Sequence, residues 1–171
     1  YDDVMNQQRE VVYDRRNYAM KGDDILSEIN EISSEYIDNI VNSYCQSANS
    51  EDWNWDDLES DIMDTFSLDI SQTRDKISDL SKINQYINDG ISEILKYKND
   101  TSDPEMFKNF QRYIISTTID SNWRDHLYSM DQLREGIGLR AYGQKNPLIE
   151  YKKEGFGMFN EMISNIDYEI L

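Results

Sequence analysis

The chain has 171 residues and carries 34 Asp and Glu against 17 Lys and Arg, a formal net charge of −17. A surface this acidic repels phosphate backbones, so we expect no nucleic acid among its partners. Aromatic residues make up 12% of the chain, which is more than a disordered acidic chain carries. Apolar residues never run beyond three in a row, which excludes a transmembrane segment and a signal-peptide core.

The acidic residues are concentrated in the middle of the chain. Residues 23–107 hold 21 acidic and five basic residues, whereas residues 1–22 hold four of each. Residues 108–171 are also nearly balanced, with nine acidic and eight basic residues. A shift of this kind separates subdomains. The single cysteine, Cys45, excludes an internal disulfide, and its place after an apolar stripe predicts a buried side chain.

Apolar residues recur at helical spacing along the chain, which predicts an all-α fold. In chain order, Gly22 predicts a helix end, or at least a kink, near residues 22–24. Four apolar stripes follow. They are Ile25, Ile29, Ile32, Tyr36, Ile40 and Tyr44; Ile77, Leu80, Ile83, Ile87, Ile91 and Ile94; Phe107, Phe110, Ile114, Ile119, Trp123, Leu127, Met130 and Leu133; and Phe156, Phe159, Ile163, Ile166 and Ile170.

Both prolines of the chain predict helix starts. Asp103 precedes Pro104 and Asn146 precedes Pro147, and each pair is typical of an N-cap followed by the first helical residue. The apolar pattern stops between Gly136 and Asn146. We therefore expect the last two helices to be antiparallel arms joined by a loop.

The glycine-rich segment 138–146 has nearly the spacing of a phosphate-binding loop. Lys145 is displaced by one position, and no Ser or Thr follows it to hold magnesium. We therefore expect a hairpin tip without nucleotide affinity. Tyr142 lies at this tip between Arg140 and Lys145, where no helical stripe buries it, which makes it a candidate binding residue.

His126 is the only histidine, which excludes a site with two histidine ligands. It is a candidate general base beside Asp125 or Asp131, and these three residues define a hydrolase hypothesis. A lone histidine on a helix next to Trp123 is more typical of a packing and hydrogen-bonding residue.

Three segments resemble the SecA family of ATP-driven preprotein translocation motors. The opening residues 1–9, Tyr-Asp-Asp-Val-Met-Asn-Gln-Gln-Arg, resemble the start of the long helical scaffold of that family. Residues 123–137, from Trp-Arg-Asp-His to Glu-Gly-Ile, resemble the first arm of its two-helix finger. Residues 139–152, which contain Leu-Arg-Ala-Tyr-Gly-Gln-Lys-Asn-Pro, resemble the fingertip and the start of the second arm.

The resemblance implies an elongated all-α module. Residues 1–48 would form a helical scaffold with a break near residues 22–24, and residues 49–107 a small acidic helical wing. Residues 108–171 would return to the scaffold and form the antiparallel two-helix finger. Gly155 stands where the family usually has a small helix former, and we expect it to soften the second arm by about 1 kcal/mol relative to Ala.

The resemblance also implies roles for five residues. Tyr142, Arg140 and Lys145 would contact the translocating polypeptide at the fingertip, while Arg16 and Trp123 would form a contact that controls the ATPase. The partners would be the motor domains of the same protein, the SecYEG channel and an unfolded preprotein.

We expect a module that is not an enzyme on its own and holds no cofactor. ATP and magnesium would belong to motor domains outside this piece of the protein. The protein would be cytoplasmic, peripheral at the cytoplasmic face of the bacterial plasma membrane. Besides the hydrolase hypothesis, a self-contained acidic helical adaptor that binds a partner helix is the alternative.

Overall fold

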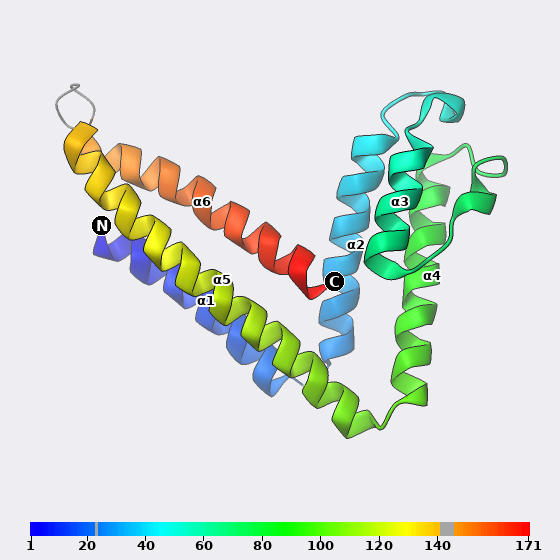
Figure 1. The fold of residues 1–171 in the computed structure, drawn as a ribbon, viewed down its shortest axis with the longest axis horizontal. Helices are drawn as coiled ribbons and strands as arrows, with labels where there is room; N and C mark the ends of the chain where they lie inside the picture. Colours follow the sequence, from blue (N-terminus) through cyan, green and yellow to red (C-terminus); the bar gives the residue numbers. More distant parts are fainter. Residues whose placement is uncertain (23, 141–145) are drawn as a thin grey trace. The chain divides into compact units, whose positions relative to one another are not determined.

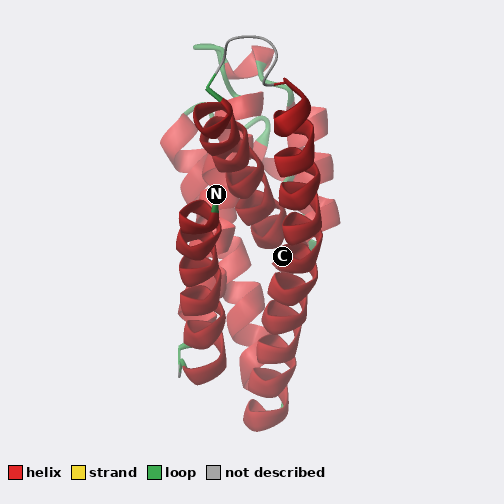
Figure 2. Cartoon of the chain, turned by 90° about the vertical axis from the view of Figure 1, so that its left-hand side faces the viewer, coloured by secondary structure: helices red, strands yellow, loops and turns green. Residues whose placement is uncertain are grey.

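The computed structural model describes residues 1–22, 24–140 and 146–171, and the side chain of Arg140 lies outside the description. The helices are α1 (Asp2–Lys21), α2 (Ile25–Tyr44), α3 (Trp55–Phe66), α4 (Leu80–Thr101), α5 (Pro104–Arg140) and α6 (Pro147–Ile170), with the short 3-10 helices η1 (Ser50–Asp52) and η2 (Ser71–Thr73). Figure 2 shows helices and loops without a strand in these ranges, which confirms the all-α prediction. In the same ranges, every helix is too short or too polar to cross a membrane.

Local sequence signals fix where the last two helices begin. The side chain of Asp103 accepts a hydrogen bond of 2.8 Å from the backbone N–H of Met106 in the first turn of α5. The side chain of Asn146 likewise accepts one of 3.0 Å from the N–H of Leu148 in α6. Each bond satisfies an N–H that has no partner within its helix, so both predicted helix starts are confirmed.

The end of α5 differs from the prediction. The helix continues through Gly136 and Gly138 to Arg140, although the apolar pattern predicts a loop from Gly136 onward. Each glycine costs a helix about 1 kcal/mol relative to alanine. Burial offsets this cost, because Ile137 packs in a cluster with Tyr151 of α6 and both side chains are 1% exposed.

The chain divides into two compact units. Unit 1 comprises Tyr1–Asp23 and Asn109–Ile170, and unit 2 comprises Asp24–Lys108 with the terminal Leu171. The division therefore falls next to the break predicted near residues 22–24. The scaffold–wing boundary between residues 48 and 49 stays a prediction, but residues 24–48 lie in one compact unit with residues 49–107. The reason is that α2 packs against α3 and α4.

Unit 1 is a bundle of α1, α5 and α6 (Figure 1). Helices α1 and α5 are antiparallel. Their contacts, from the start of α1 to its end, are Asp2 with Arg134, Gln8 with His126, Arg16 with Asp120, and Met20 with Ser116. Helices α1 and α6 are parallel, because Tyr1 contacts Tyr151 near the start of both and Arg15 pairs with Asp167 near the end of both. The predicted pair of antiparallel arms, α5 and α6, is thus joined by a third helix that contacts both.

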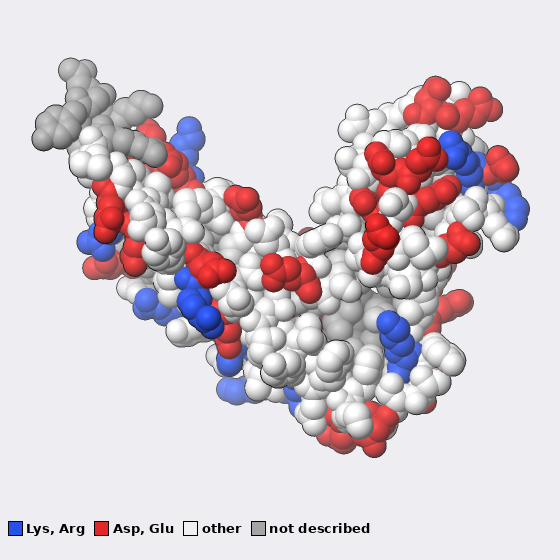
Figure 3. All heavy atoms as spheres, in the orientation of Figure 1, with Lys and Arg blue, Asp and Glu red and all other residues white. Residues whose placement is uncertain are grey.

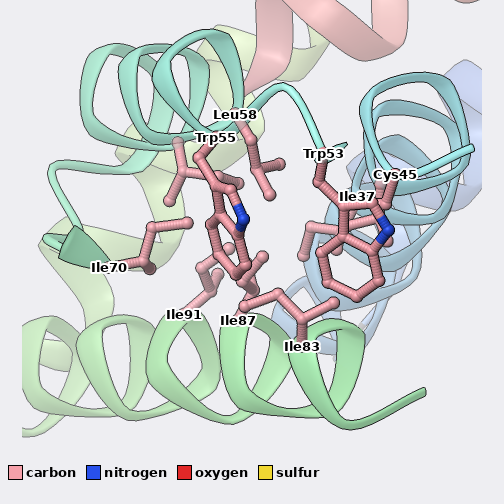
Figure 4. Packing of buried hydrophobic residues seen from close by; sticks show 11 residues of the cluster. Ile37, Cys45, Trp53, Trp55, Leu58, Ile70, Ile83, Ile87 and Ile91 are labelled. Atoms are coloured by element: carbon pink, nitrogen blue, oxygen red, sulfur yellow. The ribbon is translucent and has the colours of Figure 1, made fainter. Parts of the chain in front are cut away.

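Unit 2 has its own hydrophobic core (Figure 4). The buried residues of α4, Ile83, Ile87 and Ile91, lie at the predicted spacing. Trp53 and Trp55 cover them with ring centroids 5.4 Å apart. Each indole N–H donates a hydrogen bond of 2.8 Å to a backbone carbonyl, so neither buried ring leaves its donor unsatisfied.

The predicted stripe of α2 is buried in its first half, where Ile25 is 3% and Ile32 7% exposed, and in the second half the buried face moves by one position. Ile37 and Val41 are 0% and 1% exposed, whereas the predicted Tyr36, Ile40 and Tyr44 are half-buried at the edge of the core. Both tyrosine hydroxyls bond to side chains of α3 there: Tyr44 donates a hydrogen bond of 2.7 Å to Asp61, and the hydroxyl of Tyr36 lies 3.5 Å from that of Thr65. Cys45 is buried as predicted, and burial raises the pKa of its thiol to about 11.

Candidate functional site

The predicted site residues within the description lie on two neighbouring helices of unit 1. Arg16 belongs to the last turns of α1, and Trp123 lies near the middle of α5. Tyr142 and Lys145 lie outside the described residues, and Arg140 is described only as the last residue of α5. The part of the site that the structure describes is therefore the pair of helices that carry Arg16 and Trp123, and not the predicted fingertip.

Arg16 forms a two-pronged ion pair with Asp120 on α5. Its Nε donates a hydrogen bond of 2.7 Å to one carboxylate oxygen, and its Nη2 donates one of 3.0 Å to the other. This hydrogen bonding raises the pKa of Arg16 above its ordinary value, so the guanidinium stays charged. Asp120 lies three residues before Trp123, one helical turn away, so the pair joins α1 to α5 beside the indole.

Trp123 is itself a packing residue. It is 7% exposed, and its ring centroid lies 5.7 Å from that of His126, one turn further along α5. The imidazole in turn contacts Phe159 of α6, again with centroids 5.7 Å apart. Trp123 and His126 therefore belong to an aromatic layer between α5 and α6.

A buried polar junction of Gln8, His126 and Gly155 connects the three helices of unit 1. Nε2 of Gln8 in α1 donates a hydrogen bond of 3.3 Å to the carbonyl oxygen of Gly155 in α6, which fixes the orientation of the amide. Oε1 of Gln8 is then an acceptor, so His126 in α5 donates to it from Nε2, over 2.8 Å. Burial lowers the pKa of His126, which keeps the imidazole neutral at pH 7.

These contacts do not support the hydrolase hypothesis. His126 is 5% exposed and its Nε2 is occupied by Gln8, while Asp125 and Asp131 both face solvent. A general base needs a substrate proton within hydrogen-bond reach, and this nitrogen is closed off by α1. His126 is the packing and hydrogen-bonding residue that the alternative interpretation describes.

In α6, Ile166 is buried as the stripe predicts, but the predicted Phe156 does not belong to the buried face. The buried residues of this helix are Tyr151, Gly155, Met162 and Ile166, whereas Phe156 is 66% exposed. A Cβ added to Gly155 would lie 2.7 Å from Cε of Met130, so the glycine permits a close approach of α6 to α5. Phe156 instead lines a groove of about 340 Å³ that it shares with residues of α1, Val4 and Val11 among them.

Sequence reasoning missed Gln8, Asp120 and Asp167. Gln8 shares one face of α1 with the buried Val12 and Ala19, and a polar residue at such a position is a signal of a buried hydrogen bond. Asp120 and Asp167 carry no comparable signal, because their arginine partners are distant in sequence.

Comparison with known proteins adds a family to this geometry. The model of the SecA Wing and Scaffold domain matches residues 1–171, the whole chain. The chain is 37% identical over 169 residues to the protein translocase subunit SecA of Endomicrobium trichonymphae, covering 97% of this chain and 20% of that protein. It is 36% identical over 174 residues to the SecA of Carboxydothermus hydrogenoformans, covering 100% of this chain and 20% of that protein.

These matches distinguish the hypothesis of a SecA-type module from that of a separate adaptor. The chain spans about a fifth of the length of the curated relatives that it matches. The description of the matched family names a wing and a scaffold, which agrees with the prediction of a module without a catalytic site of its own and not with a separate adaptor. The family match covers the whole chain and so confirms the resemblance noted in three of its segments: the chain belongs to the SecA wing and scaffold family.

Proposed function

We propose that this chain is the mechanical module of a SecA-type translocation motor. It passes the movements of ATP-hydrolysing motor domains to an unfolded preprotein in the SecYEG channel. The relatives are named protein translocase subunits, and each is about five times as long as this chain, which leaves room for motor domains that bind ATP and magnesium. The motor would work as a peripheral protein at the cytoplasmic face of the membrane.

The observation that carries the proposal is the bracing of the two arms. A finger that pushes a polypeptide must not bend when its tip meets resistance. Helices α5 and α6 are fixed to each other and to α1 by the buried Gln8 junction, and further along by Asn122 with Glu169, whose hydrogen bond is 2.8 Å long. Polar contacts at specific positions resist sliding of one helix along another better than apolar contacts do.

The tip would carry the contact with the preprotein. Tyr142 offers an aromatic face with few rotamers to immobilise, so it binds many side chains without sequence specificity. Arg140 and Lys145 would keep the tip hydrated. Near the middle of α5, Trp123 and the neighbouring Arg16 of α1 would report the position of the finger to the motor domains and so control ATP hydrolysis.

The test is Tyr142→Ala in the full-length motor, measured by translocation into vesicles and by ATPase activity on the same preparations. We expect folding and ATP binding close to wild type, with translocation reduced at least about tenfold per ATP hydrolysed, because hydrolysis is no longer coupled to movement. Tyr142→Trp should retain most of the translocation. The matched control is Tyr128→Ala on α5, where the ring is 68% exposed and outside the tip. Translocation by Tyr142→Ala at the wild-type rate would show that the fingertip role is wrong.

A further inference from the structure

Unit 2 has an apolar groove along α4 that the scaffold and finger roles do not use. It has a volume of about 520 Å³ and is lined by Leu68, Tyr86, Gly90, Ile94 and Tyr97, with Asp89 and Glu93 at its border. All of these residues belong to unit 2, so the groove is complete within one compact unit.

The groove arises from a glycine inside α4. Positions 86, 90, 94 and 97 share one face of the helix, next to the buried stripe that begins at Ile83. A Cβ added to Gly90 would lie 2.9 Å from Cδ2 of Leu68, so Leu68 lies directly on the helix backbone. Glycine inside a helix costs about 1 kcal/mol relative to alanine. Here the missing side chain leaves a depression in the helix surface, and Leu68 forms its floor.

Two exposed aromatic rings flank this floor. Tyr86 is 45% exposed and Tyr97 is 70% exposed, although both lie on the face next to the core. Exposed tyrosines around an apolar depression are typical of surfaces that bind polypeptides, because they add contact area at a low cost in side-chain entropy. The stretch from residue 86 to residue 97 is about 17 Å long, which matches about five residues of extended chain.

Charge selects the partner. Residues 24–108 hold 20 acidic and six basic residues, a formal charge of −14, and carboxylates crowd the visible face of unit 2 in Figure 3. Asp89 and Glu93 are both exposed beside the apolar floor, whereas Lys98 is the single cation among the described lining residues. A surface of this charge repels nucleic acid and anionic lipid, and it attracts Lys and Arg.

We propose that this groove binds a short polypeptide segment in which apolar side chains alternate with Lys or Arg. The apolar side chains would lie on Leu68 and Gly90 between the two tyrosine rings. The cationic groups would pair with Asp89 and Glu93. This inference is independent of the proposed fingertip and would stand if the fingertip role were wrong.

The test uses the whole chain and a dye-labelled synthetic peptide of alternating Leu and Lys, with binding measured by fluorescence anisotropy. We expect Tyr97→Ala and Glu93→Lys each to weaken binding at least about tenfold, as residues central to a small interface do. Circular dichroism verifies that the variants stay helical. Gly90→Ala is a third variant, because its methyl group displaces Leu68 from the floor without changing charge.

Matched controls separate the groove from bulk charge. Asp52→Lys makes the same charge change in unit 2 at an exposed position outside the groove lining, and Tyr128→Ala removes an exposed ring in unit 1. Both should bind the peptide within about twofold of wild type. A Ser–Lys peptide of the same charge should bind at least about tenfold more weakly than the Leu–Lys peptide.

Two results would overturn the proposal. One is equal weakening by Asp52→Lys and Glu93→Lys together with no effect of Tyr97→Ala, which would show attraction by net charge alone. The other is binding of phosphatidylserine vesicles or RNA in preference to the peptide.

Discussion

At the residue scale, Arg16 and Asp120 make a contact whose geometry is specific and whose contribution to stability is small. The two side chains are 36% and 46% exposed, and ion pairs at such positions contribute about 0.2–1 kcal/mol. The pair nevertheless joins α1 to α5 one turn from Trp123, where a change in helix position would break two hydrogen bonds together. Such a contact is better suited to reporting movement than to holding the fold.

Charge reversal tests the proposed control of the ATPase. Arg16→Glu or Asp120→Arg in the full-length motor should change basal ATP hydrolysis several-fold, because the α1–α5 contact is lost. The free energy of unfolding of this chain should fall by no more than about 1 kcal/mol in either variant. The double variant restores an opposite pair and should return hydrolysis toward wild type.

The Arg74–Asp56 pair of unit 2, with an N–O distance of 3.0 Å, is the matched control. Its reversal should leave hydrolysis unchanged. If the single variants at Arg16 and Asp120 hydrolyse ATP at the wild-type rate, these residues have no part in the control.

At the scale of the elements, the four apolar stripes located α2, α4, α5 and α6, but no stripe marked α1 or α3, and the stripes did not always identify the buried face. In α6 the pattern points to Phe156, and the structure buries Gly155 instead. The two prolines and their caps fixed the starts of α5 and α6, because capping depends on residues adjacent in sequence. The choice of face depends on the partner helix, which no local pattern contains.

Gly155 and Gly157 make a matched pair in α6 that tests this packing. Gly157 has open space around its Cα, so Gly157→Ala should stabilise the chain by up to about 1 kcal/mol through helix propensity. Gly155→Ala should gain clearly less or lose stability, because Cε of Met130 must move from its place 2.7 Å away. Gly155→Leu should destabilise by about 1–3 kcal/mol through overpacking.

Urea unfolding measures all three variants. Equal stabilisation by alanine at both positions would contradict the close approach at Gly155. It would instead support the expectation from the sequence that Gly155 only lowers the stability of the helix α6.

At the scale of the whole molecule, the chain contains two cores that are each built from their own helices. Unit 2 buries Ile37 and Val41 of α2 together with Trp55, Leu58 and residues of α4. The acidic block of the sequence begins near residue 23, where unit 2 also begins, and not at residue 49, where the wing is predicted to begin. Whether residues 24–48 act with the scaffold or with the wing stays a prediction about function.

Two fragments test the boundary of the unit. Residues 24–108 alone should be helical and unfold in one cooperative transition, because they contain every element of their core. Residues 49–107 lack α2, and they should lose cooperative unfolding because the faces of α3 and α4 that pack on α2 become exposed. Circular dichroism during thermal unfolding distinguishes them. Equally cooperative unfolding of both fragments would place the boundary of the unit at residue 49.

The sequence by itself determined the all-α class, the starts of the last two helices, the burial of Cys45 and the family. These features depend on spacing, on capping residues next to each other in the chain, and on motifs long enough to be specific. Only the tertiary structure decided that Gln8 joins His126 to Gly155, that Arg16 pairs with Asp120, and that Leu68 lies on Gly90. Each of these contacts except the last joins residues more than 100 positions apart. Their formation depends on how whole helices pack, which is a property of the assembled core and not of any one segment.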